Sequence, residues 1–286
     1  MTTVIVLFHD RFVDRKECLI DIEDRANQFG DGVYEVIRVY DGEFFLFDDH
    51  LKRLEYSLNE AKIKYDINHQ QLKELLLELL KKNEVNNGGI YIQISRGIAA
   101  RSHPFPKESK PTVIAYPIPT SRPLDKQENG IQATLYQDIR WHRCDIKSLN
   151  LLGNVMAKQH ALDIGASEAI FYRDYNHVTE GSSTNVFIVN DGVIQTHPAN
   201  NFILNGITRL YIKYLAKQLD LPFNEKVFTV AELKEADEVF ISSTTSEVIP
   251  VTQIDETVIG NGKPGPIAKQ LLNAFFEHHK IQQLTK

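Results

Sequence analysis

The sequence has few cysteines. Cys18 and Cys144 are the only two in its 286 residues. Two cysteines cannot build a disulfide framework, and no CxxC pair is present for a structural zinc site. Both thiols fit a reducing compartment. We therefore expect a cytoplasmic protein without a metal centre.

The sequence also lacks an excess of basic residues and any long apolar run. Its formal net charge is -6, so no positive field gathers around the phosphates of a nucleic acid. The apolar run Val4–Phe8 is too short for the core of a signal peptide, and no later segment is long enough to span a bilayer. We expect neither a nucleic-acid nor a membrane partner.

Several common site motifs are missing as well. A dinucleotide fingerprint needs three glycines, but Gly30-Asp31-Gly32 supplies two and Glu35 stands where the third belongs. No Walker loop, HExxH or G-x-S-x-G motif occurs. The usual nucleotide, zinc-protease and serine-hydrolase sites are thereby excluded.

Strand-like and helix-like segments alternate along the chain. Val33–Tyr40 and Glu43–Phe47 are rich in β-branched and aromatic residues, and Asp41-Gly42 between them predicts a hairpin. The frequent hairpins indicate an α/β (α+β) class rather than a doubly wound sheet. The further expected elements are helices from 48 to about 61, 70–82 (ended by 87–89), 151–163, 208–219 and 266–283, and strands at 89–96, 112–118, 132–137, 169–172, 186–189, 238–242 and 257–259.

A proline-rich stretch divides the chain. Residues 117–123 read Pro-Ile-Pro-Thr-Ser-Arg-Pro, and three prolines without a backbone donor argue against a sheet interior. We expect an interdomain linker there, between a domain at 1–116 and a domain at 124–286.

Polar clusters stand out against the apolar sequence. Taken singly, each has an ordinary structural explanation: Lys147 as a surface lysine, Glu180 as a turn residue, Arg101 and His103 as a solvated loop. Their combination indicates a functional site. The clusters are 29–38, 101–106, 143–150 and 179–186, with a companion at 242–247.

The order of these clusters and the residues in them resemble the fold-type IV family of pyridoxal-phosphate enzymes. The resemblance runs from about Val4 to beyond Pro250, and residues 101–103 and 143–152 are most similar to the D-amino-acid (D-alanine) aminotransferases of that family. It implies a small N-terminal α/β domain and a larger C-terminal pseudo-barrel domain that carries the lysine, with pyridoxal 5'-phosphate between them.

The resemblance also implies two catalytic roles. Lys147 would hold the cofactor and later move a proton, since a deprotonated amine serves first as nucleophile and then as base. Its apolar neighbours Ile146 and Leu149 would favour the deprotonated form. Glu180 would lie against the pyridine nitrogen and favour the protonated ring, the better electron sink.

Further residues would bind the cofactor. By the same resemblance, Arg53 supplies positive charge to the phosphate, and Thr244 completes its cradle. Ile207 and Thr208 would present backbone amides at a helix start, where an anion is favoured. Leu204 would line the cofactor pocket.

The substrate carboxylate would be bound by Tyr34, Arg101 and His103. Arg101 and His103 are two residues apart, so in an extended chain both point to the same side. Pro104 favours that extended geometry at His103. In the family this loop reaches in from the partner subunit, which implies a homodimer.

The leading hypothesis is a D-amino-acid:2-oxo-acid aminotransferase. It would convert D-alanine and 2-oxoglutarate into pyruvate and D-glutamate, in a ping-pong cycle through pyridoxamine phosphate. A branched-chain L-amino-acid aminotransferase is one alternative, but it gives no reason for the Arg101 and His103 pair. The others are an aminodeoxychorismate lyase and a relative that binds the cofactor without catalysis.

Overall fold

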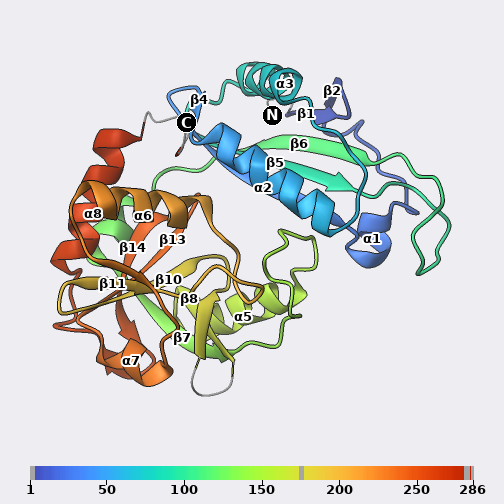
Figure 1. Cartoon of the computed structure of the whole chain (residues 1–286). Coiled ribbons are helices and arrows are strands. Elements are labelled where there is room, and N and C mark those ends of the chain that lie inside the picture. The colour runs from blue at the N-terminus through green and yellow to red at the C-terminus, as the bar shows by residue number, and fades with distance from the viewer. Residues whose placement is uncertain (1–3, 174–176, 280–283, 285–286) are drawn as a thin grey trace. The chain divides into compact units, whose positions relative to one another are not determined.

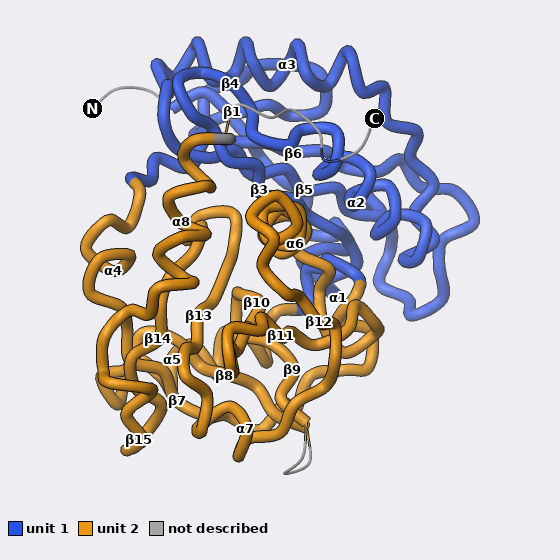
Figure 2. Tube along the Cα trace, turned by 60° about the vertical axis from the view of Figure 1, so that its left-hand side comes forward, with its two compact units in different colours: residues 1–121, 146–150, 281–286 blue, residues 122–145, 151–280 orange. Residues whose placement is uncertain are grey.

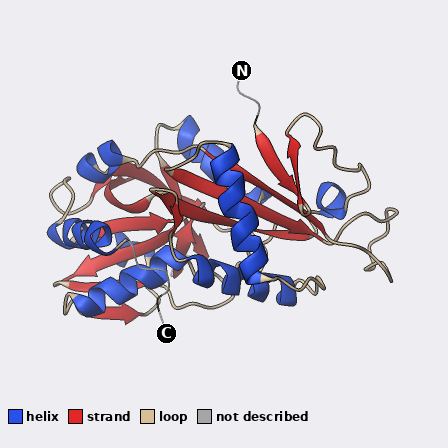
Figure 3. Cartoon of the chain, turned by 90° about the horizontal axis from the view of Figure 1, so that it is seen from above, coloured by secondary structure: helices blue, strands red, loops and turns tan. Residues whose placement is uncertain are grey.

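The computed structural model describes residues 4–173, 177–279 and 284. It divides into two compact units, residues 1–121, 146–150 and 281–286 in unit 1 and residues 122–145 and 151–280 in unit 2 (Figure 2). Each unit combines helices with a sheet (Figure 3), which confirms the α/β (α+β) class. No described helix is both long and apolar enough to cross a membrane.

Unit 1 is built on a six-stranded antiparallel sheet in the order β2-β1-β6-β5-β3-β4. Helices α2 and α3 pack on this sheet (Figure 1), where Leu54 and Leu76 join Ile37 and Ile92 in one core. The elements are β1 (Ile5–Phe8), β2 (Arg11–Asp14), α1 (Arg25–Phe29), β3 (Gly32–Tyr40), β4 (Glu43–Phe44), α2 (Phe47–Glu60), α3 (His69–Lys82), β5 (Gly88–Ser95) and β6 (Thr112–Ile118).

The expected hairpin forms the β3–β4 turn. Asp41 and Gly42 both have positive φ, 51° and 82°, as a two-residue hairpin of the favoured hand requires. Strand β4 is shorter than expected, because Leu46 adopts a left-handed conformation and helix α2 begins at Phe47.

Helix α3 ends where expected, but a different residue ends it. Its last residue is Lys82, and the Asn83 side chain then donates to Leu79 O at 2.8 Å and to Ile5 O at 3.0 Å. These bonds end the helix before Gly88, which begins β5 instead. The expectation that residues 87–89 end the helix was therefore wrong.

Unit 2 is built on a nine-stranded sheet in the order β12-β11-β10-β13-β14-β7-β8-β9, with β15 on β14. The sheet curls into a half-barrel, since β9 also contacts β10. The elements are α4 (Leu124–Asn129), β7 (Ile131–Gln137), α5 (Leu152–Asp163), β8 (Glu168–Arg173), β9 (His177–Gly181), β10 (Asn185–Asn190), β11 (Val193–Thr196), α6 (Ile207–Gln218), β12 (Phe223–Glu225), α7 (Val230–Glu235), β13 (Glu238–Ser243), β14 (Glu247–Ile254), β15 (Thr257–Val258) and α8 (Pro266–His278). The last helix was expected to end at 283, and residues 280–283 lie outside the described part of the chain.

The proline-rich stretch begins inside the sheet. Pro117 belongs to β6 and pairs with Ile90 of β5. Strand β1 pairs with β6 only at Ile114 and Ala115, so Pro117 has one neighbouring strand, and proline is tolerated at such an edge. This fits the expected strand at 112–118 and the expectation that the stretch is not a sheet interior. The chain passes from unit 1 to unit 2 after Ser121.

The lysine segment Ile146–Asn150 belongs to the compact unit 1. Tyr34 N donates to Lys147 O at 3.0 Å, and Leu149 N donates to Gly32 O at 3.0 Å, so the segment lies along β3. From the sequence, we expected this lysine in the C-terminal domain, whereas its segment belongs to unit 1. The domain boundaries at 116 and 124 stay a prediction.

Candidate active site

Lys147 is held in place by its neighbours in sequence. Ile146 is buried in the core of unit 1, and Ser148 forms a β-bridge with Val33. These contacts fix the backbone on both sides of the lysine, whose amide also donates to Ser57 Oγ at 3.2 Å. The half-buried Lys147 side chain ends with Nζ 4.2 Å from the ring centre of Tyr34. The structure thus brings together two of the expected site residues.

Arg53 lies on α2 and is bound from β3. Its Nε and Nη2 donate to Glu35 at 2.7 and 2.9 Å, and His50 Nδ1 lies 2.8 Å from Glu35 Oε2. Burial alone would raise the pKa of Glu35, but Arg53 and His50 outweigh it and hold that pKa well below its usual range. A charged Glu35 therefore fixes the Arg53 guanidinium.

Arg101 and His103 both contact one aromatic ring. The Arg101 guanidinium carbon lies 4.7 Å from the ring centre of Phe29, and the His103 ring lies 5.5 Å from it. Arg25 Nη1 donates to Ser102 O at 2.7 Å and so fixes the loop between them. The two side chains are exposed, and both contact the Phe29 ring.

Glu180 lies on β9 as a buried carboxylate with three donors. Oε1 accepts from Arg140 Nη1 at 2.7 Å, and Oε2 accepts from Leu204 N at 2.9 Å and from Asn185 Nδ2 at 3.3 Å. Burial raises the pKa of Glu180 above its ordinary value, while Arg140 opposes that shift.

Arg140 in turn is bound by a second carboxylate. Its Nε and Nη2 donate to Asp138 at 2.9 and 2.8 Å. Burial by itself lowers the pKa of Arg140, but Glu180 and Asp138 outweigh burial and raise it. The guanidinium therefore stays charged and supports the ionised form of Glu180.

Helix α6 begins at Ile207, one of the expected phosphate-binding residues. The N-cap residue is Gly206, and no side chain caps the helix, so its first amides have no partner within it. A Cβ on Gly206 would stand 2.1 Å from Asn185 Oδ1, so glycine alone fits there. Thr208 is buried in the first turn, and Thr244 lies in the turn between β13 and β14.

Comparison with known proteins identifies this arrangement. The family described as amino-transferase class IV matches residues 32–254. The chain belongs to the class IV aminotransferases. Two relatives, the D-alanine aminotransferases of Staphylococcus haemolyticus and Bacillus licheniformis, are 49% and 50% identical over 271 and 269 residues. Each match covers 94% of this chain, and 96% and 95% of the relatives.

Solved class IV structures share the fold. The branched-chain amino acid aminotransferase of Escherichia coli superposes with a TM-score of 0.91 at 27% identity, covering 99% of this chain and 96% of that one. A second branched-chain amino acid aminotransferase, complexed with N-(5'-phosphopyridoxyl)-L-glutamate, gives 0.88 at 25% identity over 99% and 96% of the two chains. The predicted fold-type IV family and the class of pyridoxal-phosphate-dependent transaminases are confirmed.

The residues of this chain fit that cofactor. A buried carboxylate, Glu180, suits a protonated pyridine nitrogen. An uncapped helix start, with glycine required at its N-cap, suits a phosphate. Lys147 offers a primary amine that is only half-buried.

Sequence reasoning missed the residues that support the site. Asp138, Arg140, Asn185 and His50 were not expected there, although each contacts an expected site residue or its partner. One general rule could have pointed to Arg140: a buried carboxylate such as Glu180 needs a cationic partner. The sequence alone did not say which arginine supplies it.

Proposed function

We propose that this class IV aminotransferase transfers amino groups between D-amino acids and 2-oxo acids, with D-alanine and 2-oxoglutarate giving pyruvate and D-glutamate. One observation carries the proposal. The D-alanine aminotransferases are 49% and 50% identical over 94% of the chain, whereas the branched-chain enzyme of Escherichia coli is 27% identical at nearly the same coverage.

Two residues carry the chemistry in this proposal. Bound pyridoxal phosphate supplies an electron sink for the negative charge that develops at the substrate Cα. Lys147 holds the cofactor through its amine and moves the proton at Cα. Glu180, bound by Arg140 at 2.7 Å, favours the protonated pyridine ring.

The phosphate is assigned to Arg53, Thr244 and the start of α6. Arg53 supplies positive charge from a position fixed by Glu35. The amides of Ile207 and Thr208 supply donors where the helix dipole also favours an anion. Leu204 is assigned to the cofactor pocket, and its amide hydrogen bond to Glu180 supports that assignment.

The substrate carboxylate is assigned to Tyr34, Arg101 and His103. Arg101 and His103 both contact the Phe29 ring, and Tyr34 lies beside Lys147. Arginine and histidine donors two residues apart suit a carboxylate, which accepts two hydrogen bonds at once. In the proposal, this loop serves the site of the partner subunit.

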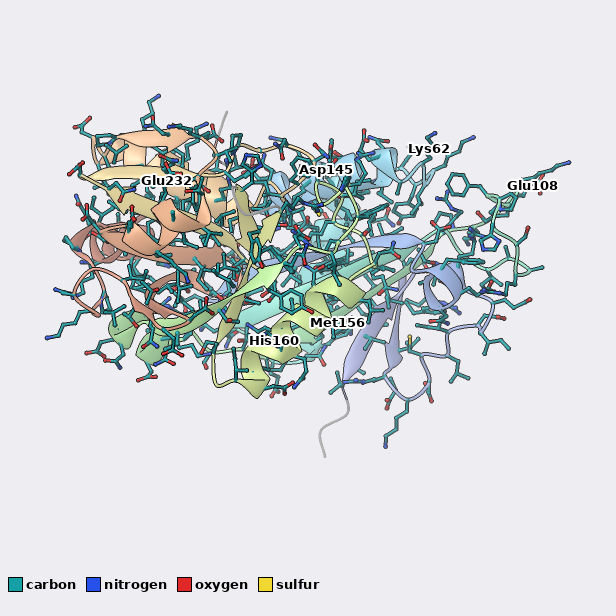
Figure 4. The ribbon with its side chains drawn as sticks, turned by 90° about the horizontal axis from the view of Figure 1, so that it is seen from below. Lys62, Glu108, Asp145, Met156, His160 and Glu232 are labelled. Atoms are coloured by element: carbon teal, nitrogen blue, oxygen red, sulfur yellow. The ribbon has the colours of Figure 1, made fainter. Side chains whose placement is uncertain are left out.

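A homodimer is part of the proposal. Exposed apolar side chains gather on two segments: Leu19 and Ile22 are 80% and 85% exposed, and Leu152 of α5 is 73% exposed. Val155 and Met156 follow on α5, where Figure 4 labels Met156. Such groups of exposed apolar residues are typical of protein interfaces. We also place the protein in the cytoplasm, because Cys18 and Cys144 are both free thiols.

A branched-chain L-aminotransferase is the second candidate, favoured by the TM-score of 0.91. Rates with D-alanine and with L-leucine as donors, each with 2-oxoglutarate, separate the two. We expect D-alanine to give the higher kcat/KM, measured for each donor by the 2-oxo acid that it yields: pyruvate from D-alanine and 4-methyl-2-oxopentanoate from L-leucine. A preference for L-leucine or L-valine would support the branched-chain function and end the D-amino-acid proposal.

A further inference from the structure

A pocket of about 390 Å³ lies within unit 2. It is lined from the ends of strands β7 and β8, from β9 and from the loop 197–202, with Asp138, Arg173 and Phe202 among the lining residues. Of the described residues that line it, none is assigned above to the cofactor or the substrate. Pockets that hold small molecules have volumes of about 300–1,000 Å³, so this pocket is large enough for a ligand of its own.

The lining combines apolar surface with several nitrogen atoms. Phe202 and Val227 supply the apolar part, and His142, His177 and His197 supply three imidazole rings. Three histidines could suggest a metal site, but no group of potential ligands in the described part of the chain is arranged to hold a metal ion. An apolar lining with a few polar groups is typical of a site for a small organic molecule.

Arg173 is the cationic side chain of this pocket. Its guanidinium carbon lies 4.9 Å from the ring centre of Phe202, and its Nη2 donates to Trp141 O at 3.1 Å. Its Nε lies 3.2 Å from Asp138 Oδ2 but forms no hydrogen bond with a described residue. The side chain is 14% exposed and lines the pocket, so a ligand in the pocket can reach the guanidinium.

Asp138 does not supply the acceptor that Arg173 requires, because other donors already occupy it. Its Oδ1 accepts from Arg140 N and Nε at 3.0 and 2.9 Å, and its Oδ2 accepts from Arg140 Nη2 at 2.8 Å and Thr179 Oγ1 at 3.3 Å. An ionised carboxylate has about four lone-pair sites for hydrogen bonds. Arg173 is therefore attracted to this carboxylate by charge and keeps hydrogen-bonding capacity for a second anion.

His197 shows that the surroundings of the pocket favour negative charge. Its side chain is buried, and its Nδ1 lies 2.8 Å from Pro198 O, so we place the proton of the neutral ring on that nitrogen. Burial lowers the pKa of His197, and the positive charges of Arg209 and Arg173 lower it further, although the bond to Pro198 opposes the shift. Surroundings that disfavour one more positive charge favour an anion.

We propose that this pocket is a second ligand site, for a small carboxylate with an apolar body. The carboxylate binds Arg173 through a charge-assisted hydrogen bond, which is stronger than a bond between neutral groups. The apolar body packs against Phe202 and Val227. This inference goes beyond the proposed function and does not depend on it.

The test uses a tryptophan beside the pocket. Trp141 is the only tryptophan of the chain, and Arg173 donates to its carbonyl oxygen. In a titration of the wild-type holoenzyme with 3-methylbutyrate, Trp141 fluorescence should change to saturation, and equilibrium dialysis of the labelled compound should give the same Kd. In Arg173→Met the Kd should rise by about 10-fold or more, as expected for loss of a hydrogen bond between charged groups. Arg15 is exposed, and Arg15→Met should leave the Kd unchanged.

Two further variants separate this site from the substrate site. Val227→Phe keeps every charge but fills part of the pocket, so it should also weaken binding, and it replaces Arg173→Met as the test if that variant does not fold. Arg101→Leu should keep the Kd, because Arg101 is assigned to the substrate. No saturable binding to the wild type, or an unchanged Kd in Arg173→Met or Val227→Phe, would overturn the second site. Binding that is lost only in Arg101→Leu would likewise overturn it, by placing the compound in the substrate site.

Discussion

Glu180 is a residue whose charge depends on two opposing effects. Burial raises its pKa, and the guanidinium of Arg140 at 2.7 Å opposes that shift. Asp138 holds Arg140 with two further hydrogen bonds, so the three residues form one buried ionic group. The protonation state of Glu180 therefore depends on Arg140 and, through Arg140, on Asp138.

Replacing this carboxylate should affect chemistry more than cofactor binding. In Glu180→Gln we expect the proton-transfer half-reaction to slow by about 100-fold or more, the usual effect of losing an electrostatic stabiliser. A neutral amide cannot favour a protonated ring, whereas the residues assigned to the phosphate stay intact. Stopped-flow half-reactions and cofactor titration measure the two effects separately. Equal losses in both would instead assign Glu180 a structural role.

Lys147 should be the residue that carries the cofactor. We expect Lys147→Ala to abolish turnover, because no other amine replaces its nucleophile. Borohydride reduction followed by peptide mapping should find the label on Lys147 in the wild type.

Lys158 gives a matched control for that experiment. Its Nζ donates to Ser167 O and lies 3.6 Å from Glu168, so Lys158→Ala should keep both turnover and the label. A label on Lys158 would show that the assignment of Lys147 is wrong.

At the scale of elements, Glu35 joins strand β3 to helix α2. It is buried and binds both His50 and Arg53 of that helix. Breaking a buried ion pair on one side is strongly destabilising. We expect Glu35→Gln to lower the free energy of unfolding by about 3 kcal/mol at pH 7 and to weaken the hold on Arg53.

The pH dependence of this effect has a defined sign. The pKa of Glu35 is depressed in the folded state, so its contribution is present above the unfolded value of about 4.3 and is lost as the pH falls. Urea unfolding at several pH values should show the difference from wild type shrinking below about pH 4. Glu55, exposed beside His69, is the control, and Glu55→Gln should change stability by less than about 1 kcal/mol. A difference independent of pH would rule out a charged Glu35.

The elements also show where local sequence signals were sufficient. The hairpin at Asp41-Gly42 and strand β6 at Thr112–Ile118 were predicted, because turn residues and β-branched runs act on their immediate neighbours. Strands β11 and β14 were missed. Strand β14 carries Pro250, which usually argues against a strand, and one of its partner strands, β7, lies far away in sequence.

At the scale of the whole molecule, the proposed homodimer makes a testable claim about Arg101. If Arg101 serves the partner's site, Lys147→Ala on one subunit and Arg101→Leu on the other damage the same site of a mixed dimer. One site of each mixed dimer then has both residues intact. After subunit exchange in an equal mixture, we expect about a quarter of wild-type activity, since half of the dimers are mixed and each has one complete site.

The mixing experiment needs the two parents as controls. Arg101→Leu alone should lower kcat/KM for D-alanine by about 10- to 100-fold, and Lys147→Ala alone should be inactive. Light scattering should give twice the chain mass of 32.7 kDa for the wild type. No gain above the Arg101→Leu parent would place Arg101 in the site of its own subunit.

The sequence by itself determined the family and predicted the residues of the site. Lys147, Glu180, Arg101 and His103 lie in short local clusters. Such clusters can be recognised from the sequence because their residues are neighbours along the chain. The periodicity of side chains similarly placed Tyr34 and Arg38 on one face of β3.

Only the tertiary structure decided how the charges are balanced. Arg140 and Glu180 are 40 residues apart and Arg53 and Glu35 are 18 apart, so no local pattern pairs them. The same holds for Arg38, whose Nε and Nη1 have no hydrogen-bond partner among the described residues, a fact that only the folded chain shows. Ionic interactions act through space between buried groups, and the folded chain alone fixes those distances.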